Sequence, residues 1–322
     1  ILSFFAMNKY LILNLFFSMI SFSGVWRLYR FFYEQYPHLH KQFAIAILYL
    51  PSFVFWSSGI LKEPICIAAI GWITYGLYEI FYKRKNLLFN VAVILLFGYL
   101  LYVIKVYILI SYIPFFILYL ILKNVTLIKS RFARLSLVVG LIVIATTMFN
   151  TVMEEIAGTL VGYGGDDITK NITAYQKAYA EQEDASSNFS LGVEYDGSMG
   201  SLVRIAPAAI TATLFRPFLW ESKKISTLIS SFESLAIMLF TLFVFYRAGP
   251  LFFLRSLTKD PVILYCMLFA LLFALFVGAT TANFGTLVRY KIPCLPFYII
   301  ALFLIQDRVR TIKNNLVVKE VV

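Results

Sequence analysis

The chain has 322 residues, of which 61% are hydrophobic, 18% aromatic and only 14% charged, and its mean hydropathy is +0.81. A soluble domain is about 45–50% apolar and about 25% charged, so this chain has too little polar surface to face water. Its apolar runs are continuous rather than alternating, which excludes a membrane β-barrel. The net charge of +11 indicates basic cytoplasmic loops rather than nucleic-acid binding. We therefore expect an all-α, polytopic helical membrane protein in contact with membrane lipid.

About nine apolar runs approach the roughly 20 residues that a membrane span needs. In chain order they are Ile1–Val25, Gln42–Ile60, Pro64–Tyr82, Leu87–Ile104, Val106–Leu122, Leu135–Met153, Phe232–Tyr246, Pro261–Val277 and Pro293–Ile305. Only Lys105 separates the fourth run from the fifth, a pattern compatible with two short helices in a hairpin. The chain starts at Ile1 without a methionine, so we expect that a leader was removed or that one or more segments precede it.

Basic residues gather in alternate loops between these runs. Because cytoplasmic loops carry an excess of Lys and Arg, these loops are predicted to be cytoplasmic, with the C-terminus inside and Ile1 outside. The basic residues are Arg27, Arg30, Lys41, Lys83, Arg84, Lys85, Lys123, Lys129, Arg131, Arg134, Arg247, Arg255, Lys259, Arg308, Arg310 and Lys313. We expect one transmembrane domain over residues 1–322, in a bacterial inner membrane. The net acidic segment 154–231 is then an extracytoplasmic loop.

Six basic residues lie on the predicted outer side, close to the ends of apolar runs. The excess of Lys and Arg in cytoplasmic loops does not account for them. A charge kept near the hydrocarbon layer is a functional-site hypothesis by default, and an anionic ligand such as a phosphate would explain these cations. A structural role stays open, in which Lys62 pairs with Glu63 or the cations anchor the helices at the interface. The six are Lys62, Lys105, Arg204, Arg216, Arg289 and Lys291.

Other catalytic patterns are missing from the sequence. His38 and His40 lie in a predicted cytoplasmic loop without further ligands, so we expect no metal site. The glycines at Gly162–Gly165 lack the Lys and Ser/Thr of a phosphate-binding P-loop. We expect no cofactor, and we expect three free, buried cysteines because all three lie in or beside apolar runs. They are Cys66, Cys266 and Cys294.

Three short stretches resemble bacterial multi-spanning proteins of cell-surface polysaccharide synthesis. They are Pro51–Glu63 (PSFVFWSSGILKE), the basic break Lys105-Val106-Tyr107, and Gly285–Pro293 (GTLVRYKIP) followed by Leu295-Pro296. Such proteins are similar to the GT-C glycosyltransferases, which take a sugar from a polyprenyl-phosphate carrier at the outer face. Those enzymes usually place a catalytic acid in the first outer loop, and because Ile1 is predicted to lie outside, we expect that loop to be either upstream of Ile1 or missing. They also more typically carry arginine at the position of Lys105.

This resemblance implies an inverting sugar transfer, in which a carboxylate deprotonates an acceptor hydroxyl while cations hold the departing phosphate. Glu63 and Glu221 are the catalytic candidates. A lipid-linked glycan polymerase or ligase, which would depend on Arg204 and Arg216, is one alternative. A non-enzymatic membrane subunit or flippase is another. The candidates for binding the substrate and its phosphate are Lys62, Lys105, Tyr107, Arg204, Arg216, Arg289 and Lys291.

Overall fold

The computed structural model describes residues 2–124, 130, 132–133, 135–144, 146–148, 189, 191, 199–222, 224–281 and 283–321. Within these residues the chain is helical and contains no strand, which confirms the predicted class. The chain divides into two compact units, Ile1–Phe116 (unit 1) and Ile117–Val322 (unit 2). The three cysteines are buried and free, as predicted.

Five helices in the described part of the chain are long and apolar enough to cross a membrane. They are Tyr10–Gln35, Lys62–Lys83, Leu87–Lys123, Thr227–Ala248 and Pro261–Thr280. A pair bent by 62°, Phe284–Tyr290 with Leu295–Ile312, would be a sixth if it forms one span. Two shorter apolar helices are Leu135–Met148 and Val203–Phe215. The chain is therefore a helical membrane protein, although the predicted number of nine spans is not confirmed.

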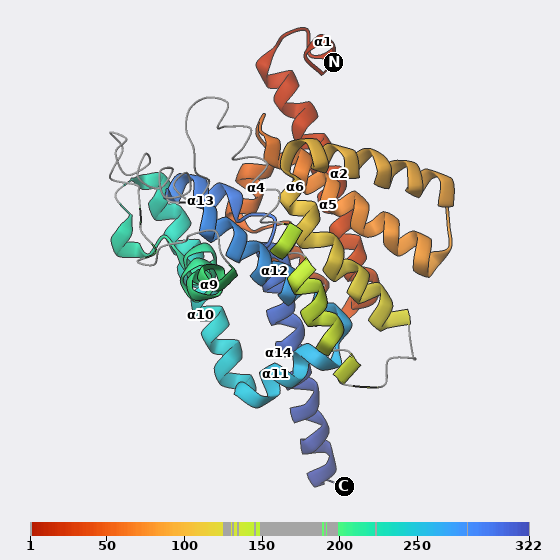
Figure 1. The fold of residues 1–322 in the computed structure, drawn as a ribbon, viewed down its shortest axis with the longest axis vertical. Helices are drawn as coiled ribbons and strands as arrows, with labels where there is room; N and C mark the ends of the chain where they lie inside the picture. The colour runs from red at the N-terminus through yellow and green to blue at the C-terminus, as the bar shows by residue number, and fades with distance from the viewer. Residues whose placement is uncertain are drawn as a thin grey trace. The chain divides into compact units, whose positions relative to one another are not determined.

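Unit 1 is built around two packed helices, α2 (red) and α5 (orange) (Figure 1). A Cβ atom at Gly24 of α2 would overlap the backbone of Ala68 in α5, and one at Gly71 would overlap the backbone of Gly24. Small residues commonly permit such close crossings between membrane helices. The elements are α1 (Leu2–Phe5), α2 (Tyr10–Gln35), η1 (Pro37–Leu39), α3 (His40–Ile47), α4 (Pro51–Ser57), α5 (Lys62–Tyr78), the π-helical turn η2 (Glu79–Lys83) and α6 (Leu87–Asn124), which continues into unit 2.

The predicted span Gln42–Ile60 is not one helix. It breaks into α3 and α4, and Leu50 between them is extended, with φ −71° and ψ 116°. A residue before proline is restricted away from the helical region, and Pro51 itself favours the first position of a new helix. The apolar composition continues through this break, so composition alone did not reveal it.

The first predicted span, Ile1–Val25, is shifted toward the C-terminus. The long helix begins at Tyr10 and continues to Gln35, after a turn in which Met7 and Asn8 have positive φ. Two basic residues that were predicted to lie in a loop, Arg27 and Arg30, therefore lie within α2.

Unit 2 is centred on α12, which is buried along almost its whole length and packs on α9 and α14. A Cβ atom at Gly278 would overlap the backbone of Ala209, and the Thr213 hydroxyl donates to the Ala274 carbonyl at 2.7 Å. The elements are α9 (Met199–Phe215), η4 (Leu219–Glu221), α10 (Ile225–Ala248), α11 (Pro250–Lys259), α12 (Pro261–Thr280), α13 (Phe284–Tyr290) and α14 (Leu295–Val321). Most of the predicted loop 154–231 lies outside the described residues, and its last part forms α9, η4 and the start of α10.

Candidate functional site

Unit 1 brings two predicted site residues into a buried ion pair. The Lys105 ammonium donates to Glu63 Oε1 at 2.8 Å, and the two side chains are only 9% and 2% exposed. The Lys105 ammonium also lies 6.0 Å from the centre of the Tyr107 ring. Lys62, by contrast, is exposed. The structure thus joins a catalytic candidate to a phosphate-binding candidate 42 residues away.

Both members of this pair lie where a helix is irregular. Glu63 is in the first turn of α5, which follows an extended Leu61. A carboxylate there is favoured by the positive end of the helix dipole. Lys105 lies at a kink in α6, with non-helical φ −154° and ψ 75°. The kink confirms the predicted interruption at this lysine, but the predicted division into two separate segments is not confirmed, because Leu87–Lys123 is one candidate span.

Unit 2 holds the second predicted acid–base pair, Arg216 and Glu221. The Arg216 Nε donates to both Glu221 oxygens at 3.0 and 3.1 Å, and its Nη2 also binds Oε1. The guanidinium lies 4.5 Å from the ring centre of Phe189 and 5.2 Å from that of Phe284. Glu221 Oε2 in addition accepts from the Phe218 N–H at 2.9 Å. These contacts hold Arg216 in one orientation.

A groove of about 530 Å³ runs beside this pair. One of its walls is a face of α9, where Pro207, Ala208, Thr211 and Ala212 recur at helical spacing. The rest is supplied by Leu191 and the segment that follows α9, namely Arg216, Phe218, Trp220 and Glu221. Trp220 is 79% exposed. The groove therefore combines a fixed guanidinium with an exposed aromatic side chain.

The remaining candidates in unit 2 do not line this groove. Lys291 is 1% exposed, and its ammonium donates to the Arg216 carbonyl at 3.0 Å and to the Ser234 hydroxyl at 2.9 Å. These two hydrogen bonds hold the backbone of Arg216 in place. Arg289 is half-buried and donates to the hydroxyl of Tyr290 at 3.3 Å. Arg204 is exposed on α9. It lies roughly 16 Å from the C-terminal end of this helix at Phe215, given a rise of about 1.5 Å per residue.

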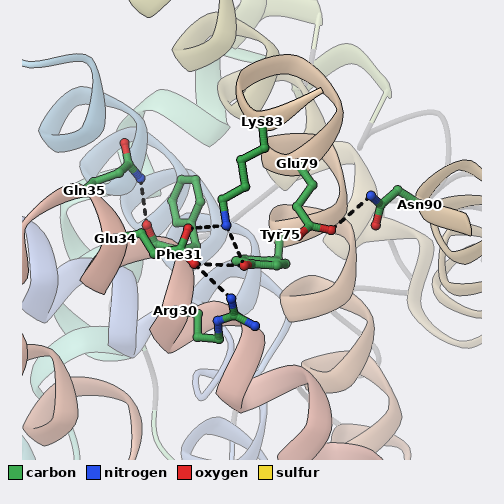
Figure 2. A network of polar contacts seen from close by, with 8 residues as sticks. All are labelled: Arg30, Phe31, Glu34, Gln35, Tyr75, Glu79, Lys83 and Asn90. Carbon is green, nitrogen blue, oxygen red and sulfur yellow. Dashed lines mark hydrogen bonds and ion pairs between the residues drawn. The ribbon is translucent and has the colours of Figure 1, made fainter. Parts of the chain in front are cut away.

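Sequence reasoning missed a polar cluster in unit 1 that is centred on Glu34 (Figure 2). Glu34 Oε1 accepts from Arg30 at 3.1 Å and from the Tyr75 hydroxyl at 2.9 Å, while Oε2 pairs with Lys83 at 2.6 Å. Lys83 also donates to the Tyr75 hydroxyl at 2.8 Å. The cluster ties the end of α2 to α5 and η2. The sequence did contain a signal for this cluster, because Glu34 follows Arg30 by four residues, the spacing of an ion pair on a helix. It was missed because this basic segment was interpreted as a loop.

Comparison with known proteins does not identify a family for this chain. No family model, no curated protein and no solved structure matches the chain.

Proposed function

We propose that this chain is a membrane glycosyltransferase that uses a polyprenyl-phosphate-linked sugar for assembly of a cell-envelope polysaccharide or glycoconjugate. The observation that carries the proposal is the buried pair of Glu63 and Lys105. Replacing a buried ion pair by apolar residues of similar volume is often neutral or stabilising. Stability alone is therefore a weak reason for a membrane chain to retain this pair, which favours a functional role.

In the proposed reaction Glu63 is the general base. The acceptor hydroxyl gives its proton to the Glu63 carboxylate, and the acceptor oxygen forms a bond to the anomeric carbon of the sugar. The bond from that carbon to the phosphate oxygen breaks, and its electron pair leaves with the polyprenyl phosphate. Lys105 and the exposed Lys62 stabilise the charge on the departing phosphate, as preorganised cations do in other transfer reactions. No metal is required for these steps.

The test is sugar transfer by the full chain in vesicles. The probes are undecaprenyl phosphates that carry radiolabelled glucose, galactose, mannose or N-acetylglucosamine, with a bacterial envelope extract as acceptor. We expect labelled product from one of these donors and a loss of about 10²–10⁴-fold in Glu63→Gln, the usual contribution of a general base. Glu79→Gln, which changes a carboxylate of the same unit outside the pair, is the control. Unimpaired transfer by Glu63→Gln would refute the role of Glu63.

The groove beside Arg216 favours a second candidate, a lipid-linked glycan polymerase or ligase. A guanidinium has five N–H donors, so Arg216 can donate to a phosphate oxygen while it stays paired with Glu221. The exposed Trp220 supplies an apolar surface for a ligand. An open groove of about 530 Å³ with both features suits a phosphate-bearing glycan better than a single sugar.

Product length separates the two candidates. A polymerase gives a ladder of glycan lengths on a gel, and Arg216→Gln removes the ladder. A transferase adds one sugar and gives a single product. Arg310→Gln is the matched control, because this exposed arginine lies on α14 and does not line the groove. Loss of the ladder in both variants would point to a general effect on the protein rather than to the groove.

A further inference from the structure

The short helix α11 (Pro250–Lys259) joins two candidate membrane spans of unit 2. One residue, Gly249, links it to the end of α10, and one residue, Asp260, links it to the start of α12. Gly249 has φ 72° and ψ 155°, a backbone conformation essentially confined to glycine, and Pro250 then begins α11. Figure 1 shows α11 turning away from the line of α10. Because both connections are this short, α11 lies at the membrane surface where the two spans end.

One side of α11 is packed against the rest of unit 2. The Phe253 ring lies 5.6 Å from the ring of Phe245 in α10, measured between centroids. Ser256 is buried, and its hydroxyl donates to the Phe252 carbonyl at 2.8 Å. The helix also packs on α12 and α14. These contacts fix which side of α11 is turned outward.

The outward side of α11 has an apolar part and a basic part. Leu251 and Leu254 are 60% and 61% exposed, and Arg255 and Lys259 are exposed as well. Successive residues of an α-helix are about 100° apart, so the two leucines are about 60° apart around the axis. Arg255 follows about 40° from Leu251, and Lys259 follows about 40° further. Leucines beside cations are typical of a helix that lies in the membrane interface, with its apolar side among acyl chains.

The basic part of α11 is not neutralised by a neighbouring acid. Among the residues that the structure describes, Arg255 and Lys259 have no acidic partner. The adjacent acid, Asp260, pairs instead with Arg308 at 3.1 Å. A third exposed cation, Arg247, lies in the last turn of α10. Basic residues at a membrane surface attract anionic headgroups, so this surface is complementary to an anionic leaflet.

We infer that α11 is an interfacial anchor that binds anionic phospholipids. Leu251 and Leu254 lie among the acyl chains, and Arg255 and Lys259 bind the phosphates of headgroups that carry no compensating amine. A lipid surface is the occupant that fits, because a span at each end holds α11 at the membrane. In the predicted orientation this is the inner leaflet. The inference does not depend on the proposed sugar transfer, since no residue of α11 belongs to the buried ion pair or lines the groove described above.

A fluorescent label on this surface tests the inference in the full chain. The native cysteines are buried, so a cysteine introduced at an exposed position, as in Leu254→Cys, can be labelled with the fluorophore NBD. The labelled protein is placed in vesicles of phosphatidylcholine and phosphatidylglycerol with identical acyl chains. A nitroxide quencher is attached to the acyl chain of one lipid or the other, at the same mole fraction. We expect phosphatidylglycerol to be enriched around the label at least about fivefold, because one basic residue near an anionic headgroup contributes about this factor.

Two further changes to the labelled protein assign this preference to α11. Arg255→Gln/Lys259→Gln should bring quenching by the two lipids close to equality, because the leucines remain and the headgroup cations are lost. Lys9→Gln/Lys224→Gln removes the same charge from exposed positions outside α11 and should leave the enrichment unchanged. The chain without Leu254→Cys is taken through the same labelling, to show that the native cysteines do not react. Folding of each variant is checked by thermal unfolding in detergent.

Four results would overturn the inference. Equal quenching by the two lipids before the charges are changed would show that α11 has no preference for anionic lipid. Absence of quenching by either lipid would show that water, another protein or a second copy of this chain covers the outward side. Enrichment that persists in folded Arg255→Gln/Lys259→Gln would exclude these cations as its cause. An equal loss in Lys9→Gln/Lys224→Gln would assign the preference to the net charge of the chain.

Discussion

The Lys105 ammonium lies 2.8 Å from the Glu63 carboxylate inside unit 1, and the two side chains are 9% and 2% exposed. Removal of one partner leaves the other charge buried, which typically costs about 3–5 kcal/mol. We therefore expect Lys105→Met to lower the free energy of unfolding by about this amount, as measured by denaturant titration in detergent. The double variant Glu63→Gln/Lys105→Met should recover much of the loss, and Lys85→Met, an exposed lysine of the same unit, should change little. A double variant no more stable than Lys105→Met would contradict a buried pair.

The crossing of α2 and α5 makes a second prediction. Because Gly71 meets the backbone of Gly24, Gly71→Leu should separate the helices and destabilise unit 1 by at least about 1–3 kcal/mol, the usual cost of overpacking. The melting temperature in detergent checks this. Gly98→Ala is the control, since a Cβ atom there meets nothing within 4 Å. Comparable losses in both variants would show that the crossing is not specific to Gly71.

A third prediction concerns the carboxylate that fixes Arg216. Hydrogen bonds to charged groups contribute about 1.5–3 kcal/mol, and partial exposure of this pair reduces that value. We expect Glu221→Gln to cost about 1 kcal/mol and Glu221→Ala more, because Ala also leaves the Phe218 N–H without its acceptor. Unfolding by urea measures both changes. Equal stability of Glu221→Gln and Glu221→Ala would argue against a contribution from the hydrogen bond between the Phe218 N–H and Glu221.

The start of α12 gives a fourth prediction, which separates a helix cap from an ion pair. Asp260 Oδ1 accepts from the Val262 N–H at 2.9 Å, and Oδ2 pairs with Arg308 at 3.1 Å. Asp260→Asn keeps an oxygen for the cap and loses the charge, whereas Asp260→Ala loses both. We expect Asp260→Ala to be the less stable by about 1 kcal/mol in thermal unfolding, since this is the usual contribution of a cap. Identical melting temperatures would show that the cap contributes nothing.

Much of the fold class could be predicted because apolar composition is a property of the sequence itself. The run Pro261–Val277 became α12 with a shift of three residues at one end, and the break at Lys105 was visible as a charge inside an apolar run. The break before Pro51 was misjudged because hydropathy continues through it.

The site was only partly predictable, because side-chain partners depend on which helices pack together. Glu63 and Lys105 were both singled out, but nothing in a separation of 42 residues shows that they meet. Glu34 was missed because Arg30 was assigned to a loop. Only the extension of α2 to Gln35 and its packing on α5 bring Glu34 to Tyr75 and Lys83.

The central claim is that Glu63 and Lys105 act in sugar transfer rather than only in folding. The charge-swapped variant Glu63→Lys/Lys105→Glu tests it most directly, because it keeps an ion pair and moves the carboxylate to the other helix. Its thermal unfolding and its transfer of labelled sugar from undecaprenyl phosphate should be measured on the same vesicles. The account predicts a folded protein whose transfer rate has fallen at least about 10²-fold, the smallest usual contribution of a general base. A folded swapped variant that transfers sugar at the wild-type rate would contradict it.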